Sequence, residues 1–559
     1  MCACSPVGPT GDNGPVYVIA GAAENGWDVL RCTESGAVLD ARTVPGLVAA
    51  VTGIERAEHP RWVFGGEEYA SLLEAGVRVR RCHDLALVES ILLSFEGRYG
   101  EPATLAAAYA RLAGLPVPEE QARTRRPSAQ PVLFETEPDP LPGGVSPARA
   151  CAEVLADQLR RIEGSAWAPR LRMLVAAESA GALAAAEMQA NGLPYRADVH
   201  AELLTGLFGP RPANGARPKV LADLATEVSE AFGGKPVNPE HPGSVQRAFA
   251  RAGIDLPSTK AAVLREIEHP AVAPLLRYKE LSRLYAAHGW FWLDEWVREG
   301  RFCPEFVVGG VVSGRWASRG GAALQLPKLL RTCVRADPGR RLVVADAAQL
   351  EPRVLAALSE DSRLAELATA GDMYESLAED AFAGQRHDAK IAMLSAMYGG
   401  TAGHAAALLA VLRKRFPEAI GYVERAARHG EHGRSVRSVL GRTSPPPAAL
   451  MGEAGLDSLR AARDWGRFTR NFVVQSSASD WALTVLATLR LDLLDELPDA
   501  ELVFFVHDEI IVHCRARDAP RCAELVERAA EQARRLVFGR TKVRFPLPAN
   551  VVDCYADAK

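Results

Sequence analysis

Residues 504–513, FFVHDEIIVH, place two adjacent carboxylates inside an apolar run. Acidic side chains are costly in an apolar strand unless they are paired, hydrogen-bonded or bound to a metal. Two interpretations follow. Asp508 and Glu509 either form the tip of a hairpin, where their charge returns to solvent, or belong to a metal site on a rigid turn. In both cases residues 501–513 are expected to form two strands that meet at the turn.

The composition is that of an ordinary globular protein. The chain has 559 residues, 48% of them hydrophobic and 24% charged, and its length predicts about three or four folding units. Because the net charge is −4, nucleic-acid binding would require a local basic groove. The ten cysteines form no zinc-like pattern and are expected to be reduced thiols. We find neither a signal peptide nor a membrane span in the sequence, which predicts a cytoplasmic protein.

Strand and helix patterns divide the chain into an N-terminal α/β part and a longer, mainly helical part. Three short strands are expected at 16–20, 27–31 and 37–42, followed by helices. A Pro-rich stretch at about 116–147 is typical of a linker or a long surface loop. Beyond it, alanine-rich amphipathic segments predict helices.

A carboxylate also stands at the end of another apolar strand. The segment from Leu342 to Ala345 is expected to form a strand that carries Asp346 at its end, with a helix soon after. An acid at such a place is commonly a helix N-cap. Two Mg²⁺ ions about 4 Å apart need shared anionic oxygen ligands on stiff elements, so Asp346 opposite Asp508 also fits a two-metal site. Both interpretations stay open from this segment alone.

Residues 386–400, RHDAKIAMLSAMYGG, carry a stripe of four side chains at helical spacing. Arg386, Lys390, Leu394 and Tyr398 recur every four residues and would span about 18 Å of helix. The two cations could bind a polyphosphate at one end while the tyrosine stacks on a base at the other. An amphipathic helix with a charged end is the alternative. The glycine pair that follows is expected to end the helix.

Two further segments carry residues suited to nucleic acid. Arg467, Asn471 and Gln475 share a helical face in RFTRNFVVQSS, and long polar side chains of this kind suit a sugar-phosphate backbone or a minor groove. The stretch VVSGRWASRGGAALQLPKLLR contains Arg315 and Gln325 together with other cations, and its small residues permit close approach to phosphates. A solvated helical face and a charged surface loop are the respective alternatives.

In their order along the chain these segments resemble the signature motifs of family A DNA polymerases, the family typified by bacterial DNA polymerase I. SGRWAS with LQLP is similar to TGR and LQN, and ADAAQLEPR is similar to DYSQIELR. RHDAKIAMLSAMYGG is similar to R-x3-K-x3-F-x3-Y-G, and RFTRNFVVQSS to R-x3-N-x3-QGT, while VHDE is unchanged. The resemblance covers the chain from roughly residue 165 onward.

The resemblance implies the architecture of a polymerase I large fragment with a degenerate 3′–5′ exonuclease domain. Residues 1–165, including the Pro-rich linker, would form an α/β, ribonuclease H-like domain. Residues 166–559 would form a mainly α, α+β polymerase domain shaped like a right hand. Its parts are expected at about 190–300 for the thumb, 301–357 and 446–559 for the palm, and 358–445 for the fingers.

The resemblance also implies a role for each matching residue in DNA synthesis. Asp346 and Asp508 would hold two Mg²⁺ ions, for which Mn²⁺ can substitute, and Glu509 would be a supporting catalytic acid. Lys390 would protonate the pyrophosphate leaving group. The implied nucleotide-binding residues are Arg386, Lys390, Leu394, Tyr398, Gln349 and Glu351, the last of which would exclude ribonucleotides. The implied DNA-binding residues are Arg315, Gln325, Arg467, Asn471, Gln475 and His507.

The polymerase motifs depart from the family pattern at a few positions. Ala347, Ala348 and Pro352 replace larger residues after Asp346, and proline fits early in a helix, where its missing N–H is tolerated. Leu394 replaces an aromatic residue. We expect this change to weaken nucleotide positioning or alter fidelity without loss of catalysis.

The N-terminal part departs further from the family. Its first strand, VYVIAGA, lacks the Asp-x-Glu pair that two metal ions in an exonuclease site would require. Glu68 and Asp84 are the candidate remnants of that site. We therefore expect a scaffold without nuclease activity.

The sequence thus predicts a template-directed DNA polymerase without proofreading, active in repair, gap filling or lesion bypass. Its partners would be primer-template DNA and dNTPs, and it would be a monomer. A bifunctional polymerase with a working exonuclease is one alternative, and a non-catalytic protein that clamps primer-template junctions is another. Glu351 argues against an RNA polymerase.

Overall fold

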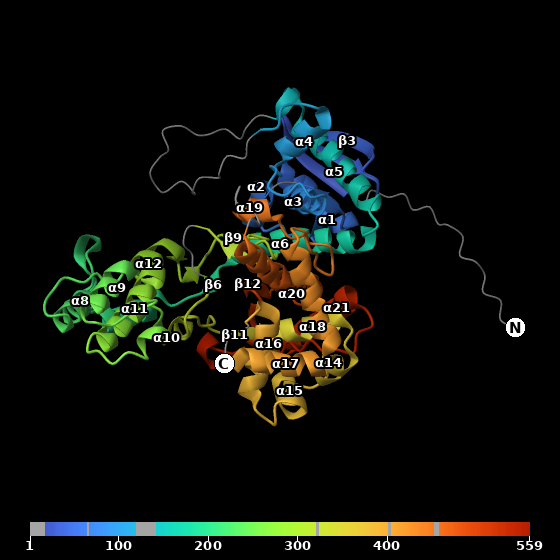
Figure 1. The fold of residues 1–559 in the computed structure, drawn as a ribbon. Coiled ribbons are helices and arrows are strands. Elements are labelled where there is room, and N and C mark those ends of the chain that lie inside the picture. The colour runs from blue at the N-terminus through green and yellow to red at the C-terminus, as the bar shows by residue number, and fades with distance from the viewer. Residues whose placement is uncertain are drawn as a thin grey trace. The chain divides into compact units, whose positions relative to one another are not determined.

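The computed structural model describes residues 17–63, 66–118, 141–319, 324–400, 404–451 and 458–558 (Figure 1). Most of the predicted linker, residues 119–140, lies outside these ranges. The chain divides into two compact units. The first takes the chain up to Asn191 together with Phe306–Ala317 and Gly339–Val552, and the second takes Gly192–Glu305, Ser318–Pro338 and the C-terminus from Asp553.

The first unit contains a five-stranded N-terminal sheet whose strand order is β3-β2-β1-β4-β5. β1 pairs antiparallel with β2 and parallel with β4, β2 pairs antiparallel with β3, and β4 pairs parallel with β5. The three strands predicted from the sequence are confirmed. The strands are β1 (Tyr17–Ala23), β2 (Gly26–Cys32), β3 (Val38–Val44), β4 (Arg61–Val63) and β5 (Arg81–Cys82).

Helices cover both faces of this sheet because side chains alternate between the faces along each strand. On one face Val18 packs with residues of α1 and α2, and on the other Ile19 packs with residues of α5. The helices of this part are α1 (Leu47–Glu58), α2 (Gly66–Glu74), α3 (Leu85–Phe95), α4 (Leu105–Ala113) and α5 (Pro147–Glu163).

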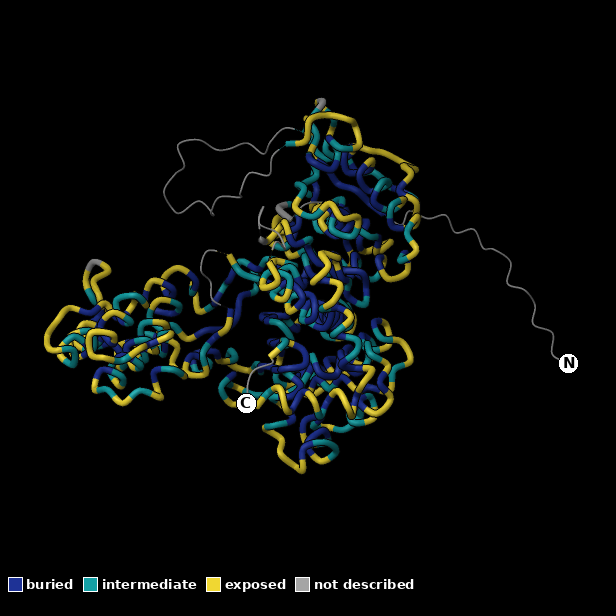
Figure 2. The backbone as a smooth tube through the Cα atoms, in the orientation of Figure 1, coloured by how far each residue is buried: buried dark blue, intermediate teal, exposed yellow. Residues whose placement is uncertain are grey.

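Two long helices, α6 (Ala168–Asn191) and α20 (Leu459–Glu496), join the N-terminal part to the rest of the first unit. Their middle segments are largely buried (Figure 2). The guanidinium of Arg490 in α20 donates to Glu187 of α6 at 2.6 Å, and the hydroxyl of Tyr69 in α2 donates to the same carboxylate at 2.5 Å. The N-terminal sheet and the long helices therefore share one interior.

The second sheet of this unit is antiparallel with the order β12-β13-β11-β14. The register places Asp346, the last residue of β11, opposite Glu509, the first residue of β13. The helix α21 (Ala519–Phe538) packs against this sheet and against α20. The strands are β11 (Arg340–Asp346), β12 (Glu501–Val506), β13 (Glu509–Arg515) and β14 (Ala549–Val552).

A group of helices lies between β11 and α20 in the sequence. Gly399 ends α16 with a φ of 77°, in agreement with the predicted helix end. Pro352 is the third residue of α13 and fits there as predicted. The helices are α13 (Leu350–Ser359), α14 (Ser362–Leu367), α15 (Met373–Ala381), α16 (Arg386–Tyr398), α17 (His404–Arg415), α18 (Pro417–Glu431) and α19 (Pro447–Met451).

The second unit is mainly helical and has an aromatic core. Phe208, Tyr285 and Trp290 make edge contacts with one another. Three two-residue strands form a small sheet in the order β6-β8-β7. Among the described residues, no helix is both long enough and apolar enough to cross a membrane. The strands are β6 (Leu193–Pro194), β7 (Val297–Arg298) and β8 (Arg301–Phe302), and the helices are α7 (Ala197–Phe208), α8 (Lys219–Ala231), α9 (Pro242–Arg251), α10 (Ala261–Leu264), α11 (Val272–His288) and α12 (Trp290–Trp296).

Candidate active site

The turn between β12 and β13 carries His507 and Asp508. His507 has a φ of 59°, a left-handed conformation that is uncommon for a residue with a side chain. On either side of the turn Phe505 and Ile510 are each 2% exposed, so the buried strands fix its position. The backbone N–H of Ala347 donates to the carbonyl oxygen of Asp508 at 3.2 Å and ties the turn to the segment after β11. The predicted hairpin is confirmed, but its tip is held inside the protein.

Asp346 and Asp508 lie close enough to influence each other electrostatically. Burial raises the pKa of Asp508 to about 7, and the Asp346 carboxylate contributes to the rise. Arg315 acts in the opposite direction, and Glu351 raises this pKa slightly further. The N-cap of α13 is Gln349, which rules out the alternative in which Asp346 caps that helix. The structure therefore brings together the two aspartates that the sequence paired.

Glu351 joins three elements at one side of this acidic pair. Its carboxylate accepts one hydrogen bond from Arg315 Nη2 and another from the hydroxyl of Tyr398, each at 2.5 Å. Burial, the hydrogen bond to Glu351 and the negative charge of that carboxylate together hold the pKa of the Tyr398 hydroxyl above its usual value. Burial and Arg315 lower the pKa of His507, which favours a neutral imidazole at physiological pH. Arg315 and Glu351 therefore act on Asp508, and the same two side chains also act on Tyr398 and His507.

A buried ion triad lies beneath the loop that carries Arg315. Arg442 donates to Glu178 of α6 at 2.7 Å and to Asp480 of α20 at 3.3 Å. Gly314 has a φ of 85°, and a Cβ there would lie 2.4 Å from Nε of Arg442. Only glycine fits next to this guanidinium. The motif comparison missed the triad, although an acid inside each of the apolar segments LVAAESAGAL and SSASDWAL is a sequence signal for a buried pair.

Trp316 gives the Arg315 loop a second anchor. Its side chain is 3% exposed and contacts Phe505 of β12 edge-on, with ring centroids 4.9 Å apart. Phe505 stands two residues before His507 in the chain. The loop with Arg315 and the turn with Asp508 are therefore held against each other.

The start of α13 is fixed by Arg353, another residue that the motif comparison did not single out. Arg353 is fully buried, and its guanidinium donates only to backbone carbonyl groups. Five such acceptors around one guanidinium hold the segment between Asp346 and Glu351 rigid. The acceptors belong to Ala348, Ala368, Ala370, Gly371 and Arg544.

The predicted stripe lies along α16. Arg386, the first residue of the helix, donates to Asp372 at 2.7 Å and lies over the ring of Tyr374 at 5.7 Å. Lys390 is exposed, Leu394 is half-buried, and Tyr398 is 42% exposed. The sequence did not indicate Asp372 or Tyr374 as partners of Arg386, because the contact joins two helices across a turn.

The second predicted stripe lies along α20. Arg467 is exposed and forms an ion pair with Asp464. A Cβ on Gly399 would lie 2.9 Å from Cγ of Arg467, so this part of α20 meets the end of α16. Gln475 is half-buried, and Oδ1 of Asn471 is buried with no hydrogen-bond partner among the described residues. A buried acceptor of this kind is available for a ligand donor.

The other predicted residues have different surroundings. Gln349 has a φ of 54°, and its Oε1 accepts from the backbone N–H of Met373 at 2.7 Å. Glu509 is 8% exposed within β13. Gln325 belongs to the second unit. The ligand-binding roles of all three stay predictions. In the described part of the chain, no group of three or more His, Cys, Asp or Glu side chains is arranged to hold a metal ion.

Several known proteins are similar to this chain in sequence or in fold. The sequence model of DNA polymerase family A matches residues 219–552. DNA polymerase I of Pseudomonas aeruginosa is 26% identical over 332 residues, which is 54% of this chain and 35% of that protein. The thermostable DNA polymerase I of Thermus aquaticus is 28% identical over 327 residues, or 53% of this chain and 37% of that protein. The matches thus span little more than a third of these curated relatives.

Among solved structures, the POL domain of Pol1 from M. smegmatis, in complex with DNA primer-template and dNTP, has the same fold. The TM-score is 0.72 at 18% sequence identity, with 98% of this chain and 96% of that chain covered. The predicted fold class is thereby confirmed for the polymerase part.

Proposed function

The chain belongs to DNA polymerase family A, and from this premise we propose that it adds dNTPs to a primer 3′-hydroxyl under the direction of a template strand. The observation that carries the proposal is the pairing of Asp346 and Asp508 beside Arg315 and Glu351. We further propose that it acts as a monomer in the cytoplasm, in repair, gap filling or lesion bypass.

The carboxylates of Asp346 and Asp508 suit divalent metal ions. Mg²⁺ is usually bound by one or two carboxylates together with substrate phosphates, so a site without a third acidic ligand is adequate. Burial, with the neighbouring Asp346 carboxylate, raises the pKa of Asp508, and a bound cation would favour the charged form of both carboxylates. Mg²⁺ or Mn²⁺ held there would lower the pKa of the primer hydroxyl and neutralise charge on the triphosphate.

The side chains of α16 would then act on the triphosphate. Arg386 and Lys390 supply positive charge to the β and γ phosphates, and Lys390 is the proposed donor of a proton to pyrophosphate. Lys390 is exposed and ready for this contact, whereas Arg386 must first exchange Asp372 for phosphate. Tyr398 would lie beside the templating base, with its hydroxyl fixed by Glu351.

Primer extension tests the proposal directly. With a labelled primer annealed to a longer template, Mg²⁺ and the four dNTPs, we expect extension to the template end. With one dNTP, we expect addition only where it complements the template. A protein that binds the primer-template junction with high affinity and leaves the primer unextended would instead support the clamp alternative.

Substitution of Glu351 is expected to weaken discrimination against ribonucleotides. Glu351→Ala removes the proposed barrier beside the sugar and frees Tyr398 and Arg315. We expect the preference for dNTPs over rNTPs to fall by about tenfold to a hundredfold, since one displaced steric contact is worth roughly 1–3 kcal/mol. The ratio of kcat/KM for the two sugars measures it. Glu379→Ala, at an exposed position on α15, is the control and should keep the ratio unchanged.

We propose that the N-terminal part is a ribonuclease H-like domain that has lost nuclease chemistry. In support, three antiparallel strands continue into two parallel ones, with helices on both faces. β1 carries no acidic residue. At Gly21 there is no room for a side chain, because a Cβ would lie only 2.6 Å from the backbone nitrogen of Ala148. The carboxylate of Asp84 caps α3 by accepting from the N–H of Leu87 at 3.0 Å.

We therefore expect no 3′–5′ degradation of a single-stranded oligonucleotide in Mg²⁺ or Mn²⁺. The substrate should carry its label inside the strand, so that shortening from the 3′ end is seen as a ladder. The assay should use Asp508→Asn as well as the unaltered protein, because a polymerase-deficient variant cannot refill a shortened end. A ladder that persists in this variant would establish the bifunctional alternative.

A further inference from the structure

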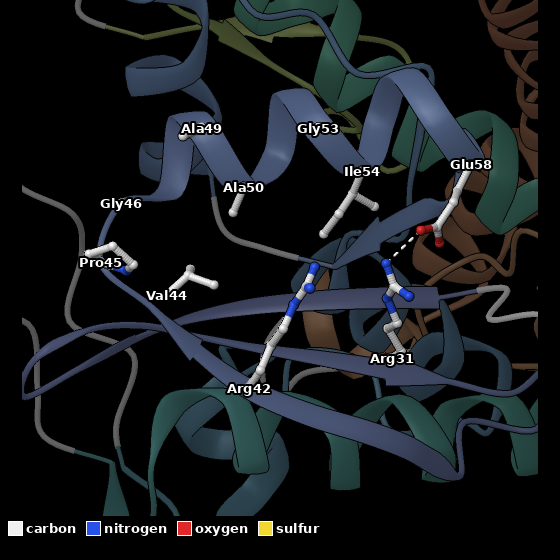
Figure 3. A pocket seen from close by; sticks show the side chains of 10 residues that line it. All are labelled: Arg31, Arg42, Val44, Pro45, Gly46, Ala49, Ala50, Gly53, Ile54 and Glu58. Carbon is white, nitrogen blue, oxygen red and sulfur yellow. Dashed lines mark hydrogen bonds and ion pairs between the residues drawn. The ribbon is translucent and has the colours of Figure 1, made fainter.

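A hollow of about 500 Å³ lies between α1 and the strands β2 and β3 (Figure 3). β3 is the edge strand of the N-terminal sheet, and the buried side chains of α1 pack over β1 and over Val29 of β2. The outer part of the same sheet face is left open beside the helix. None of the lining residues belongs to the candidate active site.

Two arginines extend from the strands into this hollow. The antiparallel register pairs Val29 with Arg42 and Arg31 with Asp40, so both guanidinium groups lie on the face that α1 covers. Arg31 Nη2 donates to Glu58 at 2.5 Å (Figure 3). Arg42 forms no hydrogen bond or ion pair among the described residues. The lining therefore carries one positive charge that no carboxylate balances.

The helical wall of the hollow is built from small residues. Gly46, Ala49, Ala50 and Gly53 line it along α1. A glycine inside a helix costs about 1 kcal/mol relative to alanine and usually has a packing or functional reason. At Gly53 packing does not require a glycine, because a Cβ there would meet no atom within 4 Å. The wall instead presents backbone and methyl groups to the hollow, on the opposite side from the exposed guanidinium of Arg42.

From this arrangement we propose that the hollow binds a nucleotide, with its phosphate on Arg42 and its base against the α1 wall. A guanidinium matches phosphate oxygens with two parallel donors. A planar base can pack against a wall of glycine and alanine, and the volume is within the range of small-ligand sites. A free nucleotide and a nucleotide unit of a DNA single strand share this chemistry. The proposal is independent of the polymerase activity.

Hydrogen–deuterium exchange localises such binding. Full-length protein would be mixed with dAMP or with a short single-stranded oligonucleotide, in chelator that removes metal-dependent binding at the polymerase site. We expect slower exchange of amides in residues 44–54. With dAMP, exchange in residues 386–398 should stay unchanged. Protection by dAMP identifies a free-nucleotide site, and protection by the oligonucleotide alone identifies a single-strand site.

Three variants separate binding from folding. We expect Arg42→Gln to raise the ligand concentration needed for half-maximal protection about tenfold, since one charge-assisted contact is lost. Gly53→Ala should weaken it similarly while leaving thermal stability unchanged or higher, because the added methyl takes up part of the lining where the base would pack and favours the helix. Arg56→Gln removes the same charge from an exposed site on α1 outside the hollow, and should have no effect. No protection by either ligand at millimolar concentration, or protection that Arg42→Gln and Gly53→Ala leave intact, would overturn the proposal.

Discussion

Asp508→Asn and Asp346→Asn are each expected to lower single-nucleotide incorporation by at least about a thousandfold. Asparagine preserves the shape of the side chain but removes the anionic oxygen that a divalent ion requires. Both aspartates sit on stiff elements, a strand end and a two-residue turn, so their carboxylates are held in fixed positions. The rate should be measured with Mg²⁺ under single-turnover conditions.

Asp255→Asn provides the matched control for this loss. Asp255 is an exposed aspartate of the second unit that forms no ion pair among the described residues, and its exchange should leave the rate unchanged. A loss of less than about tenfold in both active-site variants would contradict the two-carboxylate mechanism.

The stability of the metal-free protein provides an independent readout of the same site. The folded-state pKa of Asp508 is raised from 3.8 to about 7, so the folded protein holds this proton more tightly than the unfolded chain does. The contribution of Asp508 to stability is therefore expected to be present below about pH 4 and to be lost as pH rises to about 7, and the difference in stability between the unaltered protein and Asp508→Asn at each pH measures it. Asp508→Asn cannot titrate and should be more stable than the unaltered protein at pH 8 in chelator, by up to about 4 kcal/mol, since one pKa unit corresponds to about 1.4 kcal/mol. An inactive but stabilised variant would exclude unfolding as the cause of inactivity.

The sequence predicted the strands and helices whose pattern is contained in one short segment. FFVHDEIIVH consists of two short apolar runs separated by a polar turn, so β12, β13 and their connection follow from ten residues. The pairing of Asp508 with Asp346 did not follow from either segment. It required several motifs in a fixed order, because the two strands become neighbours only through a sheet whose order differs from the order in the chain.

The contacts that hold the candidate active site in place could not be predicted from sequence patterns, because they join residues far apart in the chain. Arg442 and Glu178 are 264 residues apart in the chain. A motif of spaced residues on one helix cannot show such a contact. The same holds for Arg386, whose partner Asp372 lies on another helix, and for the hollow at Gly53, which exists only where a helix and two strands meet.

Arg442→Met is expected to destabilise the protein by about 3–5 kcal/mol, because it leaves the carboxylates of Glu178 and Asp480 buried without a cation. Both carboxylates are almost fully buried, at 2% and 0% exposed. The free energy of unfolding of the first unit, measured by urea denaturation, tests this value. Because Gly314 lies against Arg442, the variant should also loosen the loop of Arg315.

Two comparisons distinguish loss of a buried charge from loss of any arginine. Arg172→Met breaks an ion pair on the exposed side of α6 and should change stability by less than about 1 kcal/mol. Adding Glu178→Gln and Asp480→Asn to Arg442→Met removes the two unpaired charges, and should recover much of the loss because neutral groups are cheaper to bury. Equal losses in the single and triple variants would mean that packing of the arginine side chain, and not charge balance, holds the Arg315 loop in place.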